Sequence, residues 1–85
     1  MDSKNEKLRN ACQTALNTFK KLSDPKLSEI QSKLEYCIGS YDFDKNPVGL
    51  YEYGHKALSA LKAYKQNNPR KVSVKTVTDL EKSLV

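Results

Sequence analysis

Residues 8–22 read LRNACQTALNTFKKL and contain the clearest periodic pattern of the chain. Their apolar side chains recur at spacings of three and four residues, which places them on one face of a helix. The apolar positions are Leu8, Ala11, Cys12, Ala15, Leu16, Phe19 and Leu22. Upstream, Ser3 and Glu6 have the spacing of a capping box, so we expect this helix to begin near Ser3.

A second helix is predicted after Asp24-Pro25, because Asp24 can cap a helix while Pro25 takes the first helical position. Gly39 lies near its expected C-terminus, and residues 42–46 (DFDKN) are predicted to form a loop. The apolar stripe of this helix is narrower and consists of Leu27, Ile30, Leu34, Cys37, Ile38 and Tyr41.

A third helix is predicted from Asn46-Pro47, which repeats the pairing of a cap with a first-turn proline. Its apolar residues between 50 and 64 cover about half the circumference, so it should contact more than one neighbour. Gly54 lies inside that arc and would let another backbone approach closely.

A short fourth helix is predicted from Ser73, which can serve as its cap after Asn67-Asn68-Pro69 ends the third helix. Because residues 72–78 also alternate between apolar and polar, a strand stays open as the alternative for residues 71–78.

These elements predict an all-α fold: a compact antiparallel bundle of three helices plus a short C-terminal fourth helix, in one domain over residues 1–85. The N-terminus lacks the apolar core of a signal peptide, and no stretch has the length of a membrane-spanning helix. Cys12 and Cys37 fall at core-facing positions. We therefore expect reduced thiols in a cytoplasmic protein that does not enter a membrane.

The chain offers no recognisable catalytic, cofactor-binding or metal site, so we predict that it is not an enzyme and takes no cofactor. Asp42, Asp44 and Asn46 are spaced like the first ligands of an EF-hand calcium loop. However, Pro47 stands where that loop needs glycine, and Tyr53 stands where it needs a bidentate glutamate. Whether this segment binds a cation stays open.

Basic residues dominate the second half of a chain whose net charge is +5. Residues 72–80 resemble the recognition helix of helix-turn-helix regulators, but core packing by Val77, Leu80 and Leu84 is the better account of that segment. No acidic residue lies between Glu52 and Asp79. Nucleic-acid binding by the basic stretch Lys56 to Lys75 is therefore the alternative function. The candidate anion-binding residues are Lys62, Lys65, Arg70, Lys71 and Lys75.

Aromatic residues concentrate where the second helix gives way to the third. Tyr36 lies opposite the apolar stripe of its helix, so it must be exposed in a simple bundle, and Phe43 lies close to it in the chain. Exposed aromatic side chains are common in binding hot spots. The leading interpretation is a small protein-interaction module that uses Tyr36 and Phe43 to bind an unidentified protein or a second copy of itself, as a homodimer.

Residues 37–54 (CIGSYDFDKNPVGLYEYG), together with Pro69-Arg70-Lys71-Val72, resemble short uncharacterised bacterial helical proteins that have no assigned activity. The resemblance implies a bacterial cytoplasmic protein. It implies no catalytic or ligand-binding residue.

Overall fold

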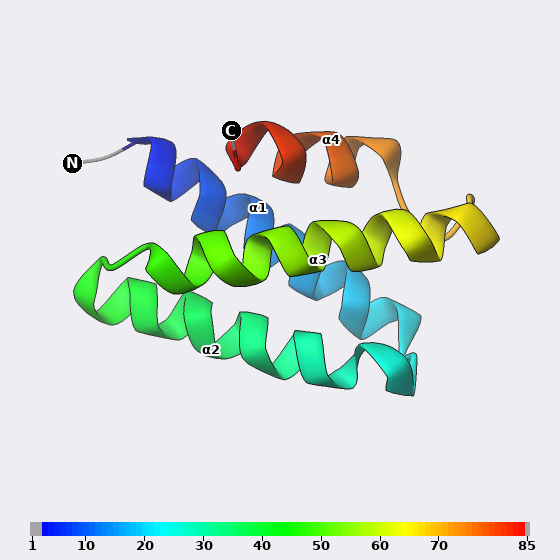
Figure 1. Cartoon of the computed structure of the whole chain (residues 1–85), viewed down its shortest axis with the longest axis horizontal. Coiled ribbons are helices and arrows are strands. Elements are labelled where there is room, and N and C mark those ends of the chain that lie inside the picture. The colour runs from blue at the N-terminus through cyan, green and yellow to red at the C-terminus, as the bar shows by residue number, and fades with distance from the viewer. Residues whose placement is uncertain (1–2, 85) are drawn as a thin grey trace.

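The computed structural model describes residues 3–84, and within them the chain forms four α-helices joined by short connections (Figure 1). Helix α1 spans Ser3–Leu22, α2 spans Ser28–Asp44, α3 spans Val48–Asn67 and α4 spans Val74–Ser83. A 3-10 turn, η1, spans Pro25–Leu27 and leads directly into α2. Residues 3–84 contain no strand, so the predicted all-α class is confirmed.

The helices form an antiparallel bundle in which α1 and α3 each contact all three other helices (Figure 1). Helices α2 and α3 lie side by side, α1 crosses behind α3, and α4 runs back along α1. The first turn of α1 and the last turn of α4 lie at the same end of the molecule. The contacts of α3 with all three other helices explain why its apolar residues cover about half of its circumference.

The three capping side chains that the sequence indicated lie before the later elements, but only Ser73 is the N-cap of an α-helix. Asp24 caps η1, and the N-cap residues of α2 and α3 are Leu27 and Pro47, which make no side-chain cap bond. Asp24 accepts a hydrogen bond of 2.9 Å from the amide two residues along, and Asn46 accepts one of 3.1 Å in the same way. Ser73 does so at 3.2 Å, and α4 begins at the next residue. Residues 74–78 are therefore helical, which settles the choice between helix and strand.

One hydrophobic core runs through the bundle and draws on every helix, because each apolar stripe turns inward. Both cysteines are free thiols within it. The buried apolar residues are Leu8, Ala11, Cys12, Ala15, Leu16, Phe19, Leu27, Leu34, Cys37, Ile38, Tyr41, Leu50, Ala57, Leu61, Val72, Leu80 and Leu84.

Two predictions about the end of the second helix are wrong. Gly39 lies inside α2, and residues 42–44 form its last turn instead of a loop. The helix ends at Lys45, which adopts a left-handed conformation with φ of 61° and donates its amide to the Tyr41 carbonyl at 2.7 Å. Lys45 thus supplies the C-cap geometry that glycine usually provides.

An ion pair between α1 and α2 helps to keep that last turn helical. The Arg9 guanidinium donates Nε to Oδ1 of Asp42 at 3.0 Å and Nη2 to Oδ2 at 2.8 Å. This two-point hydrogen bond lowers the pKa of Asp42. Asp42 is therefore held against α1, where it serves the packing of the bundle.

Candidate functional site

Helix α2 buries one side and leaves the opposite side to solvent. Its buried residues, Leu34, Cys37, Ile38 and Tyr41, fall within an arc of about 100° on the helical wheel and face α1 and α3. The surface that points away from this arc consists of Glu29, Ser32, Tyr36, Gly39, Ser40 and Phe43, and we call it the α2 face. Its residues are exposed apart from Ser40, which is half-buried.

Two aromatic side chains project from the α2 face. Tyr36 is 76% exposed, which confirms the exposure predicted for it, and Phe43, in the last turn of α2, is 91% exposed. They stand seven residues apart, which is two turns of helix and about 10 Å along its axis. Phenyl and phenol rings are among the side chains that gain most from leaving water, and here neither ring is covered by the bundle.

Gly39 lies between the two rings, three residues after Tyr36 and four before Phe43. A Cβ built on it would have no heavy atom from the rest of the fold within 4 Å. A glycine inside a helix costs about 1 kcal/mol relative to alanine, and at Gly39 no packing within the chain offsets that cost. The α2 face is thus two aromatic projections with a shallow gap between them.

The other two glycines, both in α3, have packing reasons for their lack of a side chain. A Cβ on Gly49 would lie 2.9 Å from Sγ of Cys37, and one on Gly54 would lie 2.9 Å from Cδ2 of Leu84. Both positions let a neighbouring side chain approach the α3 backbone, whereas the sequence analysis expected another backbone beside Gly54. Gly39 differs because its open side faces solvent.

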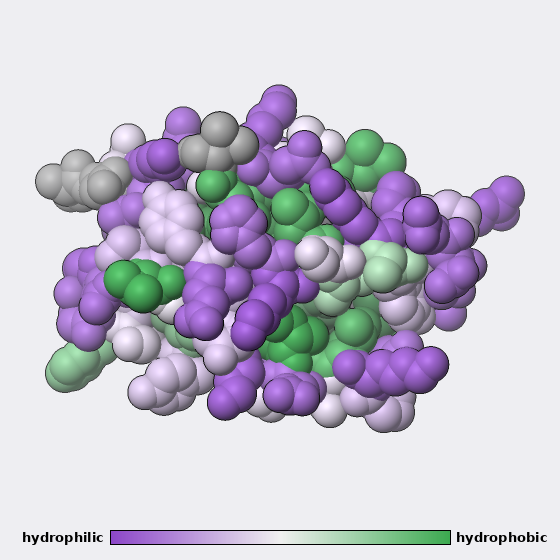
Figure 2. Space-filling model, in the orientation of Figure 1, coloured by the Kyte–Doolittle hydropathy of each residue, from purple (hydrophilic) through white to green (hydrophobic). Residues whose placement is uncertain are grey.

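Further apolar surface lies beyond the α2 face, at the turn into α3. Val48, the first residue of α3, is 67% exposed. In Figure 2, hydrophobic atoms reach the surface at the end of the molecule where α2 turns into α3. Val48 thus adds a single exposed apolar side chain, five residues after Phe43 in the chain.

The candidate anion-binding residues do not form one surface. Lys62 makes an ion pair of 3.0 Å with Glu81 of α4. The Lys65 ammonium donates to the carbonyls of Pro69 and Val72 at 3.2 and 3.1 Å, so it closes the connection between α3 and α4. The three candidates that keep exposed side chains without an ion pair to any residue in 3–84 are Arg70, Lys71 and Lys75.

The oxygen atoms of the segment that resembles a calcium loop are directed to other partners. Both Asp42 oxygens accept from Arg9, Oδ1 of Asp44 accepts from the Asn46 amide, and Oδ1 of Asn46 accepts from the Val48 amide. These bonds cap helices and do not converge on one point. Residues 3–84 hold no cluster of three or more His, Cys, Asp or Glu side chains that could bind a metal ion.

The nucleophilic side chains are placed for packing. Burial raises the pKa of Cys12 to about 12 and also raises the pKa of Cys37, so both thiols are protonated and unreactive near neutral pH. His55 is exposed on α3. Neither buried thiol is therefore paired with a base that could activate it.

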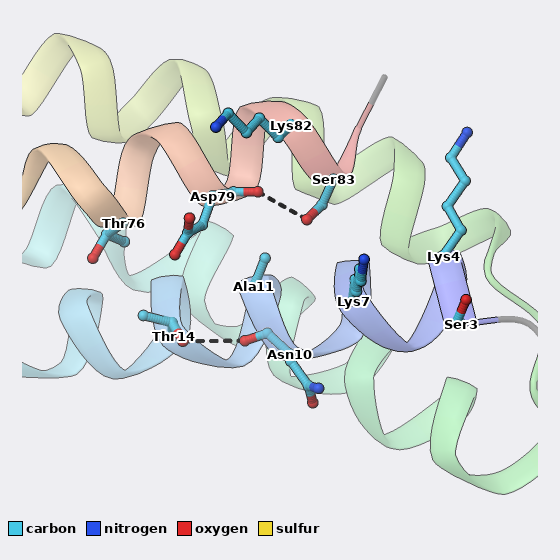
Figure 3. A pocket seen from close by; sticks show the side chains of 10 residues that line it. All are labelled: Ser3, Lys4, Lys7, Asn10, Ala11, Thr14, Thr76, Asp79, Lys82 and Ser83. Carbon is cyan, nitrogen blue, oxygen red and sulfur yellow. Dashed lines mark hydrogen bonds between the residues drawn. The ribbon is translucent and has the colours of Figure 1, made fainter.

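A groove of about 640 Å³ between α1 and α4 is a feature that sequence analysis missed (Figure 3). Three lysines, Lys4, Lys7 and Lys82, line it together with Asp79. Two of its hydroxyl groups are bonded to their own helices, because Thr14 donates to the Asn10 carbonyl at 3.1 Å and Ser83 donates to the Asp79 carbonyl at 2.8 Å. These two hydroxyls are therefore not directed at a ligand, and we do not place the site there.

Comparison with protein family models, curated proteins and solved structures finds no match for this chain. In the part of the chain that the structure describes, none of the helices combines the length and the apolar character needed to cross a membrane. The case for a function therefore rests on the surface geometry, in which the α2 face is the most exposed apolar feature.

Proposed function

We propose that this chain is a small, non-enzymatic protein-interaction module that binds its partner through the α2 face. The observation that carries the proposal is the exposure of Tyr36 and Phe43 on one side of a helix whose other side is packed in the core. Full burial of an aromatic side chain is favourable by about 1.5–3 kcal/mol. Two rings covered together would supply the central hot spot that a modest interface needs.

The helix supports this role because it holds both rings at fixed positions. The opposite side of α2 is anchored by the core and by the bidentate contact between Arg9 and Asp42. A partner that covers both rings therefore has only the aromatic side-chain rotations to restrict, so little conformational entropy is lost. The partner should present an apolar surface, since neither ring brings a charge.

A bacterial, cytoplasmic setting is part of the proposal. Cys12 and Cys37 are free and buried, which suits a compartment that keeps thiols reduced. An enzymatic role draws no support from the side chains described, because the thiols are protonated in the core, the Asp42 carboxylate is bound by Arg9, and the Asp44 carboxylate accepts from the Asn46 amide.

Nucleic-acid binding by the basic stretch Lys56 to Lys75 is the alternative function, and it draws less support. Lys62 and Lys65 are engaged within the fold, and Lys56 lies over the ring of Tyr53 at 4.7 Å from the centroid. The remaining cations sit in the connection to α4 and its first turn, where few phosphates could be contacted at once.

Photo-crosslinking tests the proposed function. A benzophenone amino acid replaces Tyr36 in one variant and Val74 in a matched control, because Val74 is 63% exposed on α4, away from the α2 face. We expect discrete protein adducts from position 36 in lysate of the source cells, and their loss when Phe43→Ala is added. The same adduct pattern from position 74, or no adduct from position 36, would overturn the proposal.

A further inference from the structure

Basic residues from parts of the chain that are far apart in sequence gather at one end of the bundle. Residues 20–27 and 68–75 together contain six basic side chains and one acidic side chain, that of Asp24. Figure 1 shows that the last turn of α1, η1 and the connection between α3 and α4 lie at the same end of the molecule. We call this surface the basic end, and it consists of Lys20, Lys21, Lys26, Arg70, Lys71 and Lys75.

The cations of the basic end are not neutralised within the fold. All of them are exposed, and none makes an ion pair with a residue in 3–84. The carboxylate of Asp24 is already engaged, because its Oδ1 accepts from the Lys26 amide at 2.9 Å. The basic end therefore presents a net positive charge to solvent.

Helix stability explains only part of this charge. Lys20 and Lys21 lie in the last turn of α1, where the helix dipole favours a cation. Lys26 precedes the N-terminus of α2, and Lys75 lies in the first turn of α4, where the dipole disfavours a cation. Like charges held at one end of a small domain also repel one another, and a bound anion would relieve that repulsion.

The side chains at the basic end favour a phosphate backbone over other anionic partners. Within residues 3–84 the exposed large apolar side chains are Tyr36, Phe43, Val48 and Val74, and only Val74 lies at this end. Single-stranded nucleic acids are held by aromatic side chains that stack on the bases, and a membrane surface is held by several apolar side chains that enter it. The backbone of a duplex needs only cations.

We propose that the basic end binds the phosphate backbone of duplex nucleic acid, independently of base sequence. The two shorter dimensions of the molecule are 23 and 17 Å. Duplex DNA carries one negative charge per about 1.7 Å of its axis, so this end covers a length of duplex with about ten phosphates or more. The stretch Lys56 to Lys75 reaches few phosphates when taken alone, because it lacks the lysines of α1 and η1. The inference goes beyond the proposed function, since the α2 face has no part in it.

Fluorescence anisotropy of a labelled DNA duplex tests this binding on the intact chain, between about 25 and 200 mM salt. Wild type should bind two unrelated sequences equally. The logarithm of its association constant should fall with the logarithm of the salt concentration, with a slope of up to about 5 if every cation of the basic end contacts a phosphate. Lys20→Gln combined with Lys26→Gln should lower this slope by about 2 and weaken binding about tenfold or more at about 0.1 M salt.

The matched control is Lys7→Gln combined with Lys82→Gln, which removes the same charge from the groove between α1 and α4. We expect this pair to leave the slope unchanged. Equal weakening by both pairs would overturn the inference, because the duplex would then respond to net charge alone. No binding at low salt, a strong preference for one sequence, or binding to phosphatidylserine vesicles without binding to the duplex would overturn it as well. Phe43→Ala should bind the duplex as wild type does, so this test and the crosslinking test can fail separately.

Discussion

Alanine substitutions at Gly39 and at Gly54 should have opposite effects on stability, because Gly39 lies on the exposed α2 face and Gly54 lies in the core. At Gly39 the added Cβ meets no atom within 4 Å, so only helix propensity changes, and it favours alanine by about 0.8–1 kcal/mol. We expect the free energy of unfolding to rise by that amount. For a domain of this size, the melting temperature should rise by roughly 4–8 °C per kcal/mol.

Gly54→Ala should have the opposite effect. Its Cβ would lie 2.9 Å from Cδ2 of Leu84, 3.6 Å from Sγ of Cys12 and 3.7 Å from Cδ1 of Leu8. Overpacking of this kind costs about 1–3 kcal/mol. Since the propensity gain offsets about 1 kcal/mol of that, a net loss of about 1 kcal/mol is expected. The two variants should differ by about 2 kcal/mol.

Urea denaturation followed by circular dichroism measures both effects, at low micromolar concentration so that the monomer is observed. The dependence of the unfolding free energy on urea should be the same for all variants, because the surface exposed on unfolding hardly changes. A Gly39→Ala variant less stable than wild type would refute the reasoning, because it would mean that the fold itself needs the gap at Gly39.

Three further predictions concern the ion pair, the thiols and the basic stretch. Arg9 lowers the pKa of Asp42 in the folded chain. The paired Asp42 carboxylate therefore stabilises the fold in full above its unfolded pKa of about 3.9, and this stabilisation is lost as pH falls through the folded pKa. Asp42→Asn should therefore reduce stability at pH 7 by up to about 1 kcal/mol, and the difference in urea midpoint should vanish in strong acid; a constant difference would contradict this. Cys12 and Cys37 should react with a thiol reagent at pH 8 only as fast as the chain unfolds, and rapid labelling of the native protein would contradict their burial. The basic stretch Lys56 to Lys75 should bind duplex DNA weakly. The logarithm of its association constant should fall with the logarithm of the salt concentration, with a slope of about 0.9 for each phosphate contacted. Nanomolar sequence-specific binding at physiological salt would reverse the ranking of the two functions.

Local signals in the sequence were enough to predict most of the fold. The spacing of apolar residues fixed which side of each helix turns inward, and Asp24, Asn46 and Ser73 marked the starts of the later elements because their side chains bond to nearby amides. The exposure of Tyr36 followed from the same periodicity. These effects act over one or two turns of chain, so they can be read without knowledge of the neighbours.

Features that depend on distant partners were not predicted. The last turn of α2 stays helical while Asp42 is held by Arg9, 33 residues earlier in the chain, and local sequence suggested a loop there. Lys65 was assigned to an anion-binding surface, although its ammonium caps backbone carbonyls. Gly39 was interpreted as a helix end, and its place between two exposed rings emerged only when α2 was seen to continue beyond it.

Amide NMR spectra of the isotope-labelled chain, recorded with and without unlabelled lysate of the source cells, test most directly the central claim that the α2 face is where this chain binds a partner. We expect the amide signals of Tyr36, Gly39 and Phe43 to shift or broaden when lysate is added, and the amides along the groove between α1 and α4 to stay unchanged. The same spectra of Phe43→Ala should respond less. Spectra that lysate leaves unchanged, or changes confined to α1 and α4, would contradict the claim.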